Sequence, residues 1–443
     1  MSKMIEQQTA THIKEVIGFL NKKADYAVLR NFEGLPDKNT ARDIDIIITR
    51  KSYKAIKEEL VDLIDKSGWK IVTYLHSDRL ITFVCATTTE EDTDIVQWDF
   101  FFDTSVWGIQ LMSAEELLVN KKFNGFLHHI DTEGEFLDKY LYDRAVNSQY
   151  PEKYRATREA ASQSPIVIEK LSRIFGCSSV AECDKKSGKK LIFTALWANI
   201  KSRPLALIAD IFYFLYTFIK NYICSNTGVS IGFTGPDGSG KTTVIDMLLE
   251  RIAPVFEKAH KYYHFRPALF GNLGDVAHSA GIKKEVDRDY SNPHRGGKTG
   301  KLSSLARLAY YSIDYIVGFF VKVKSATRIT RVVVFDRYYT DIICDSRRSR
   351  IYLNPKFLYW WGKLFIPSLN YNILLTASSE SILARKRELD EEGINTINAK
   401  IDYLSGKKGY RKVLNEKAPQ CAVNEILTYV FDEQHKRNIR RIG

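Results

Sequence analysis

The sequence predicts an α/β protein built from two unlike parts, and three observations support this prediction. From about residue 228 onward, apolar strand patterns alternate with helical patterns, which is typical of a three-layer α/β/α domain with a parallel sheet. A glycine-rich turn, Gly235–Thr242, stands between the first strand and the first helix of that part. Residues 1–190 instead carry strands in close succession, which favours an α+β domain. We therefore expect domains at 1–190 and 228–443, joined by a basic and apolar helical linker at 191–227.

The N-terminal part is expected to begin with an amphipathic helix, because apolar residues recur on one face over residues 5–22. A polar loop with glycine and proline follows at 31–42. From residue 113 to about 190, helical patterns alternate with short loops. The other expected elements are strands at 26–30, 43–49, 70–75, 80–85 and 94–102 and a helix at 52–67.

Two carboxylates open the strand at 43–49. Asp43 and Asp45 are two residues apart, so their side chains lie on the same face of that strand. Together with Asp99 from a later strand they can hold two Mg²⁺ ions that align a triphosphate for attack. The alternative is that these carboxylates are ordinary charges at the edge of a strand.

This stretch resembles the nucleotidyltransferase superfamily, whose sites use an Asp-x-Asp pair and a third Asp. More narrowly, Leu29-Arg30-Asn31 resembles the start of an uncharacterised branch of that superfamily. The superfamily usually carries Gly-Ser at this first turn to hold the nucleotide phosphates, and here Arg30-Asn31 stands instead. The resemblance implies the fold, and it leaves open whether nucleotide transfer takes place.

The segment 204–223 is strongly apolar, with basic residues on both sides and Asp210 inside it. Its length falls just short of a comfortable bilayer span. Three interpretations stay open: a buried interdomain helix, a helix lying on the membrane surface near the basic cluster at 185–190, and a true membrane span.

The turn in the C-terminal part fits the phosphate-binding pattern G-x-x-x-x-G-K-[ST] at every fixed position. Its glycines let successive backbone N–H groups point into one concavity, and the start of the next helix also attracts phosphate. Lys241 is expected to reach the β- and γ-phosphates of ATP, and the Thr242 hydroxyl to ligate Mg²⁺. The residues expected to bind the nucleotide are Gly235, Asp237, Gly238, Ser239, Gly240, Lys241, Thr242 and Thr243.

The rest of the C-terminal part supplies further strands and helices. A buried strand at 331–335 delivers Asp336-Arg337-Tyr338 at its carboxyl end, which is the edge where ligands gather in open α/β sheets. Residues 268–303 predict a long loop. The other expected elements are strands at 229–234, 261–265 and 371–376 and helices at 244–252, 305–326 and 381–389.

In these motifs the C-terminal half resembles the thymidylate-kinase branch of the nucleoside-monophosphate kinases. The matching pieces occur in family order and cover about half of the chain. They are the phosphate loop with an acidic residue at Asp237, Arg266 after the second strand, Asp336-Arg337-Tyr338, and an arginine-rich lid at 385–387.

The resemblance implies a kinase that uses ATP and Mg²⁺. Lys241, Asp336, Arg337, Arg385 and Arg387 would be catalytic: Asp336 would fix Mg²⁺ through water, and the lid arginines would meet the charge on the moving phosphoryl group. The acceptor would contact Asp237, Arg266, Arg337 and Tyr338. The alternatives are that Arg385 and Arg387 are surface cations and that Arg266 caps a strand end.

The acceptor itself stays open. The run at 340–350 is more cationic than in thymidylate kinases and lacks their glutamine, and residues 264–267 also differ from the family pattern. Such a variant, fused to the same kind of N-terminal domain, is similar to proteins of bacterial surface-polysaccharide functions. The acceptor can therefore be dTMP, another nucleotide, or a sugar or sugar-phosphate. Two further interpretations are a nucleotide-binding regulatory switch and a nucleotidyltransferase whose main activity lies in the N-terminal domain.

The net charge of +12 favours anionic partners, and no pattern of basic and aromatic residues typical of a specific nucleic-acid interface is found. The six cysteines are scattered, which predicts reduced thiols. The first residues lack the pattern of a signal peptide. We expect a cytoplasmic protein, with a peripheral location at the inner membrane face through 204–223 and a homodimer both left open.

Overall fold

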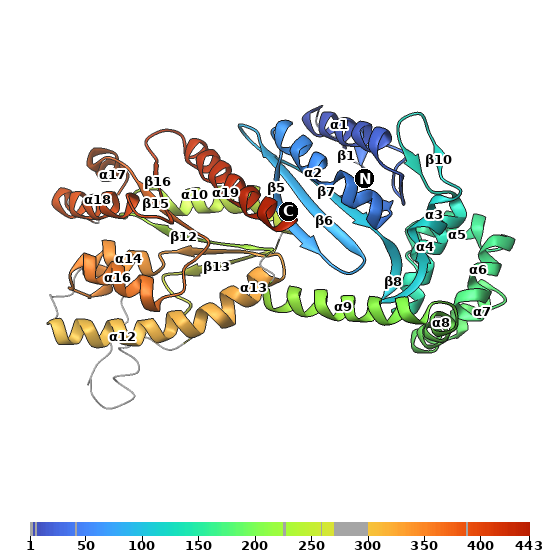
Figure 1. Ribbon diagram of the computed structural model, residues 1–443. Coiled ribbons are helices and arrows are strands. Elements are labelled where there is room, and N and C mark those ends of the chain that lie inside the picture. The colour runs from blue at the N-terminus through green and yellow to red at the C-terminus, as the bar shows by residue number, and fades with distance from the viewer. Residues whose placement is uncertain are drawn as a thin grey trace. The chain divides into compact units, whose positions relative to one another are not determined.

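The computed structural model describes residues 3–4, 7–39, 42–224, 227–257, 259–269, 300–386 and 389–443. The chain forms two compact units (Figure 1). Unit 1 comprises residues 1–87, 94–225 and 431–443, and unit 2 comprises residues 88–93 and 226–430. The protein is a mixed α/β structure that contains a wholly parallel sheet in unit 2.

Unit 1 is built on a seven-stranded mixed sheet with the order β10-β11-β2-β4-β7-β6-β5. Its two central strands, β4 and β7, are parallel, and their register places Asp45 opposite Asp99. The predicted strands of this part are therefore present, with two short additional strands at one edge. The bounds are β2 Tyr26–Val28, β4 Asp43–Ile48, β5 Lys70–His76, β6 Leu80–Thr88, β7 Thr93–Phe101, β10 Lys122–Phe123 and β11 His128–His129.

Helices α1 (Gln7–Lys23) and α2 (Arg50–Lys66) contribute to one core of unit 1. Apolar residues spaced three and four apart form one face of each helix, and residues such as Ile17 and Leu60 are fully buried there. The Thr49 side chain accepts a hydrogen bond from the Ser52 N–H, so α2 begins at a capped end directly after β4.

A second core of unit 1 is helical and lies around a hairpin that the sequence patterns did not indicate. This hairpin consists of β8 (Asp103–Val106) and β9 (Ile109–Ser113), whose strands are too short to show an alternation. The remaining elements of unit 1 are β1 Lys3–Met4, β3 Lys38–Asn39, α3 Ala114–Leu118, α4 Thr132–Ala145, η1 Glu152–Tyr154, α5 Arg155–Ala161, α6 Pro165–Phe175, α7 Val180–Lys185, α8 Gly188–Ser202 and α9 Pro204–Cys224.

The two units do not divide where the sequence suggested. Helices α8 and α9 fall within unit 1 rather than forming a separate linker at 191–227. The C-terminal residues 431–443 also belong to unit 1, because Asn438 Nδ2 donates to the carbonyl oxygens of Ile71 and Val72 at 2.9 Å each. Such a return of the chain depends on side-chain packing that a local pattern does not reveal.

Unit 2 contains the predicted parallel sheet, with the order β13-β14-β12-β15-β16. Neighbouring residues Val332, Val333, Val334 and Phe335 of β14 are all fully buried, so both faces of this strand are covered. The central strand β12 pairs with β14 on one side and β15 on the other, so connections leave it in both directions. The bounds are β12 Val229–Thr234, β13 His260–His264, β14 Val332–Asp336, β15 Tyr371–Thr376 and β16 Tyr410–Leu414.

Unit 2 contains a long helix at the position predicted from the sequence, residues 305–326. This helix runs as α12 (Lys301–Gly318), continues through a π-helical segment η3 (Phe319–Lys324) and ends with α13 (Ser325–Arg328). Most of the loop predicted at 268–303 lies outside the described residues. The other helices are α10 Lys241–Ile252, η2 Ala253–Phe256, α14 Tyr339–Cys344, α15 Ser346–Ser349, α16 Pro355–Phe365, α17 Ser379–Arg385 and α18 Glu391–Ser405. The last helix, α19 (Pro419–Ile442), begins in unit 2 and ends in unit 1.

Candidate functional site

The glycine-rich turn of unit 2 connects the carboxyl end of the central strand β12 to the start of α10 (Figure 1). Gly238 and Gly240 have positive φ angles of 85° and 86°, which glycine adopts at no steric cost. At Gly235 an added Cβ would lie 2.0 Å from the Leu375 carbonyl oxygen. The glycines are therefore required by the backbone path itself, which leads directly into the amino end of α10.

Lys241 lies inside this loop. Its Nζ donates to the carbonyl oxygens of Gly235 at 2.8 Å and Pro236 at 2.9 Å, and the residue is only 6% exposed. Burial lowers the pKa of Lys241 to about 8, and the charge of Arg337 adds to this shift. An anion bound in the loop would restore the ordinary preference of this side chain for its charged form.

The two threonines that follow Lys241 are exposed on the first turn of α10, where their hydroxyls can reach a bound ligand. The Ser239 side chain is buried, and its Oγ has no hydrogen-bond partner among the residues that the structure describes. The loop thus presents hydroxyl groups of Ser239, Thr242 and Thr243 within one turn of the buried ammonium group.

Arg385 approaches the same loop from the end of α17. Its Nη2 donates to the Asn415 carbonyl oxygen at 2.9 Å, and the Asn415 side chain donates to the Ser239 carbonyl oxygen at 2.9 Å. Arg385 Nη1 would be 3.9 Å from a Cβ built on Gly240. Asn415, which the sequence patterns did not single out, therefore ties the predicted lid residue to the loop. The other predicted lid residue, Arg387, lies outside the described residues.

Asp336 ends β14 at the same edge of the sheet, and its register partner on β12 is Phe233. Its Oδ2 accepts a hydrogen bond from the Tyr262 hydroxyl at 3.2 Å and lies 3.5 Å from His264 Nδ1. Burial acts to raise the pKa of Asp336, but the His264 hydrogen bond and the nearby cations outweigh it and hold the pKa below its ordinary value. The buried Oδ1 has no partner within the described part of the chain.

Arg337 follows Asp336 and has a positive φ of 74°, a conformation that costs energy for a residue with a Cβ. Its guanidinium is buried and forms ion pairs with Asp237 of the loop and, at 2.9 Å, with Asp341 of α14. Burial disfavours the charged form, but the carboxylates of Asp341 and Asp237 outweigh it and raise the pKa of Arg337. The strained backbone is thus held in place by charge pairs on both sides.

Arg348 of α15 is a second arginine beside the loop, and the sequence analysis did not assign it a role. It forms an ion pair with the other carboxylate oxygen of Asp237 and lies 3.5 Å from Asp345. Asp237 therefore receives guanidinium groups from two separate elements. The cationic run at 340–350 was the signal that pointed to this position.

Two residues expected to contact an acceptor are engaged in contacts within the fold. Arg266 is 4% exposed, and its Nη1 lies 2.8 Å from Asp314 Oδ2. Asp314 also accepts hydrogen bonds from the N–H groups of Ala268 and Leu269. The Tyr338 hydroxyl donates to the Pro367 carbonyl oxygen at 2.9 Å. For both residues, a contact with an acceptor stays a prediction.

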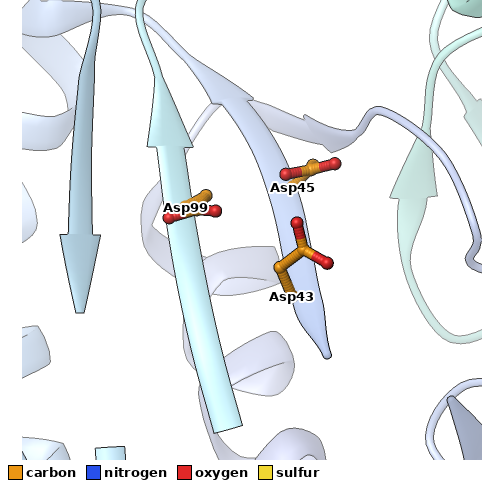
Figure 2. A group of neighbouring side chains, drawn as sticks. All are labelled: Asp43, Asp45 and Asp99. Atoms are coloured by element: carbon orange, nitrogen blue, oxygen red, sulfur yellow. The ribbon is translucent and has the colours of Figure 1, made fainter. Parts of the chain in front are cut away.

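In unit 1, the structure brings Asp43, Asp45 and Asp99 together (Figure 2). Carboxylate oxygens of all three lie within 4.8 Å of one another, as the ligands of a metal ion must. Asp45 and Asp99 are 5% and 6% exposed, and Asp43 is half-buried. Burial raises the pKa of Asp45 to about 7 and also raises the pKa of Asp99.

Arg30 offsets the negative charge of one of these buried carboxylates. Its Nε lies 2.7 Å from Asp45 Oδ2, and its Nη1 lies 2.9 Å from Asp138 Oδ2. The residue that departs from the Gly-Ser turn of the nucleotidyltransferases thus contacts the carboxylate cluster directly. Asp99 is held separately, by hydrogen bonds from Thr82 at 2.5 Å and Gln97 at 3.0 Å.

No protein-family model matches this chain, and no curated protein matches it. Among solved structures, the chain is similar to the thymidylate kinase from Ehrlichia chaffeensis, with 14% identity and a TM-score of 0.30. The match covers 46% of this chain and 98% of that chain. A similarity this low assigns neither family nor activity, so a functional assignment has to be argued from the loop sequence and the side-chain geometry described above.

Proposed function

We propose that unit 2 is an ATP-dependent phosphotransferase of the thymidylate-kinase type. The observation that supports this most is the meeting of two motifs at one sheet edge: the Gly235–Thr242 loop after β12 and Asp336-Arg337 after β14. Phosphoryl transfer between two polyanions needs fixed cations on both sides of the reaction line. Lys241 and Arg337 supply them here, and their side chains are buried, which strengthens their electrostatic effect.

The residues of the loop fit ATP and Mg²⁺. The Lys241 ammonium group is buried within the loop, and the Thr242 hydroxyl is exposed at the start of α10. The buried Asp336 Oδ1, which has no partner in the described residues, suits a water ligand of Mg²⁺. Bound Mg·ATP would supply the transferable γ-phosphoryl group, and Lys241 would hold its oxygens while Arg385 offsets charge from the opposite side.

The acceptor is dTMP, another nucleotide, or a sugar or sugar-phosphate. In the reaction, an acceptor oxygen forms a bond to the γ-phosphorus, and the bond from that phosphorus to the β–γ bridging oxygen breaks to release ADP. Arg337 and Arg348 would orient the acceptor or the transferred group, because a guanidinium fork matches phosphate geometry. Asp237 would accept a hydrogen bond from an acceptor hydroxyl when it exchanges one of its two arginine partners.

The test is to incubate the purified chain with Mg·ATP and a panel of dTMP, other monophosphates and simple sugars, and to follow ADP release. Lys241→Ala and Asp45→Ala are measured beside the natural chain. ADP release that depends on an acceptor and is lost only in Lys241→Ala supports the kinase. Tight ATP binding without any dependence on an acceptor would instead identify a nucleotide-binding switch.

A second candidate function lies in unit 1, where the three carboxylates of Asp43, Asp45 and Asp99 favour a divalent cation and hence nucleotidyl transfer. Burying three carboxylates together is costly, as the raised pKa of Asp45 indicates even though Arg30 pairs with it. This function predicts release of pyrophosphate from a nucleoside triphosphate, lost in Asp45→Ala and retained in Lys241→Ala. The same pair of variants therefore separates the two candidates.

A further inference from the structure

Helix α9 contacts the rest of unit 1 through one side of the helix, which we call the inner stripe. Tyr213 and Asn221 both bind His76: the Tyr213 hydroxyl lies 2.9 Å from His76 Nε2, and Asn221 Nδ2 donates to the His76 carbonyl oxygen at 2.8 Å. At the other end of the helix, Asp210 forms an ion pair with Arg203. A Cβ on Gly108, in the turn between β8 and β9, would lie 2.8 Å from the Asp210 carbonyl oxygen. The inner stripe is therefore closely docked, and its apolar residues Leu207 and Ile211 pack in the helical core of unit 1.

The outer face of α9 is apolar and exposed. Leu205, Phe212 and Ile223 are 83%, 69% and 63% exposed, and only 11% of the apolar window from Pro204 to Ile223 is buried. Among the described residues, this is the one helix long and apolar enough to cross a membrane. A core helix would be mostly buried, so α9 is not a core helix of unit 1. The exposed apolar residues of α9 are Leu205, Ile208, Phe212, Leu215, Tyr216, Phe218, Ile219, Tyr222 and Ile223.

The chain that leads into this helix is strongly basic, whereas α9 itself contains one basic and one acidic residue, Lys220 and Asp210. Residues 185–224 contain seven lysines and arginines and one acidic residue, so 40 of the 443 residues carry half of the net charge of +12. The single acidic residue, Asp210, is paired with Arg203 on the inner stripe. On α8, exposed Lys189, Lys190 and Lys201 share a helical face with exposed Phe193, Trp197 and Ile200. On α8, large apolar side chains and lysines thus occupy one exposed face.

We propose that the outer face of α9, with the exposed stripe of α8, binds the surface of an anionic lipid bilayer, with α9 lying in the plane of the interface. Helices that lie in the membrane interface typically carry apolar side chains next to lysines. Each lysine near an anionic membrane surface adds to the affinity of the protein for that membrane. Tyrosine and tryptophan side chains are enriched at this depth of a bilayer, and Tyr216, Tyr222 and Trp197 are all exposed here.

Two other binding modes of the outer face of α9 agree less well with these observations. A membrane span would have to bury the polar groups of Asp210, Tyr213 and Asn221, which are engaged with unit 1 along the length of the helix. A second copy of the chain would bring the same excess of positive charge against this face, and like charges repel. An anionic surface satisfies both the apolar residues and the lysines.

The experiment is sedimentation of the full chain with vesicles of phosphatidylcholine alone and of phosphatidylcholine with about 30 mol% phosphatidylserine. We expect binding to the anionic vesicles that weakens between about 0.1 M and about 0.5 M NaCl. The variant Phe212→Ser/Leu215→Ser/Ile219→Ser should bind at least about tenfold more weakly, because it removes apolar area from the outer face without touching the inner stripe. Lys189→Gln/Lys190→Gln/Lys201→Gln should lose the preference for anionic lipid.

The matched control is Val119→Ser/Phe123→Ser, which removes two other exposed apolar residues of unit 1 (76% and 55% exposed) and should bind as the natural chain does. Circular dichroism establishes that each variant is folded. The proposal fails if the natural chain does not sediment with anionic vesicles or if the triple serine variant binds equally well. It also fails if alkaline pH does not release the bound chain from the vesicles, because a spanning helix resists such extraction. It fails likewise if light scattering shows a dimer, and the triple serine variant is monomeric but binds vesicles as the natural chain does.

Discussion

Asp237, in the middle of the glycine-rich loop, binds Arg337 at the end of β14 and thereby links the two motifs that meet at the edge of the parallel sheet. The pair is buried, with the side chains of Arg337 and Asp237 3% and 13% exposed. Since Arg348 binds the same carboxylate, the loop carries an acidic residue that binds two arginines, Arg337 and Arg348, to which the proposed function gives the acceptor. This relationship makes the first prediction specific to one end of the reaction.

Asp237→Asn should lower acceptor-dependent kcat/KM by at least about tenfold while ATP affinity changes by less than about threefold, because the substitution disturbs Arg337 and Arg348 and leaves Lys241 in place. Steady-state kinetics with varied acceptor and equilibrium binding of ATP measure the two quantities. Asp390→Asn, at an exposed position in unit 2, serves as the control. An equal loss of ATP affinity would show that Asp237 belongs to the donor end instead.

The second prediction concerns the proton on Lys241. Burial lowers its pKa to about 8, so near pH 8.5 the lysine of the nucleotide-free chain is largely neutral. A bound triphosphate favours the charged form and raises the pKa, so ATP binding at this pH should take up at most about 0.8 of a proton. Calorimetric titration in buffers of different ionisation enthalpy measures that uptake.

Lys241→Met should abolish both the proton uptake and most of the ATP affinity, whereas Lys408→Met, at an exposed position, should leave both unchanged. The same shift has a consequence for stability. Between about pH 8 and the ordinary lysine pKa of 10.5 the unfolded chain holds a proton that the folded chain lacks, so this group makes the folded state more stable as the pH rises through that window. ATP binding without proton uptake in the natural chain would refute the prediction.

The third prediction concerns the carboxylate cluster of unit 1. Because burial raises the pKa of Asp45 to about 7, the site should bind Mn²⁺ at least about fivefold more tightly at pH 8 than at pH 5.5, since the ligand must lose its proton first. Electron paramagnetic resonance of free Mn²⁺ measures the affinity. Asp99→Asn should weaken binding at pH 8, and Asp62→Asn, on the exposed side of α2, should not. Equal affinity at both pH values would argue against metal binding through Asp45.

Much of the parallel sheet of unit 2 and of its loop could be predicted from the sequence, because both depend on local signals. A glycine is needed where φ is positive, as at Gly238 and Gly240, and β14 reads as an unbroken apolar run because both of its faces are buried. The partners of Asp336 were harder to foresee. Tyr262 and His264 reach Asp336 only because β13 lies next to β14, and strand order is a property of the whole fold.

In the carboxylate cluster, too, some features follow from local sequence and others depend on the whole fold. That Asp43 and Asp45 share a face follows from strand geometry, but the approach of Arg30 depends on its contact with Asp138, which lies more than 100 residues away in the sequence. The domain boundary at 191–227 was predicted from apolar composition alone. The polar contacts of Tyr213 and Asn221 with His76, which hold α9 on unit 1, cannot be read from composition.

The last prediction separates two roles for Arg266. Asp314 is fully buried and holds Arg266 by an ion pair at 2.8 Å. If the pair is structural, Arg266→Met should destabilise unit 2 by about 3–5 kcal/mol, because it removes the guanidinium group from beside a fully buried carboxylate. If Arg266 instead contacts the acceptor, as the resemblance to thymidylate kinases implies, the variant should raise the acceptor KM with little effect on stability. Urea unfolding read by hydrogen exchange in β13 and β14, together with acceptor kinetics, distinguishes the two.

A double-mutant cycle makes the structural interpretation quantitative. Asp314→Asn alone should also destabilise unit 2, because it leaves the Arg266 guanidinium buried beside a neutral partner. The combined variant should lose about 1–3 kcal/mol less stability than the sum of the two single losses, since both charges are then absent and neither is left buried beside a neutral residue. Arg411→Met, which removes an exposed ion pair with Glu425, should cost less than about 1 kcal/mol in the same assay. Additive effects of the two core substitutions would mean that Arg266 and Asp314 do not stabilise each other, and the acceptor role would then account for Arg266.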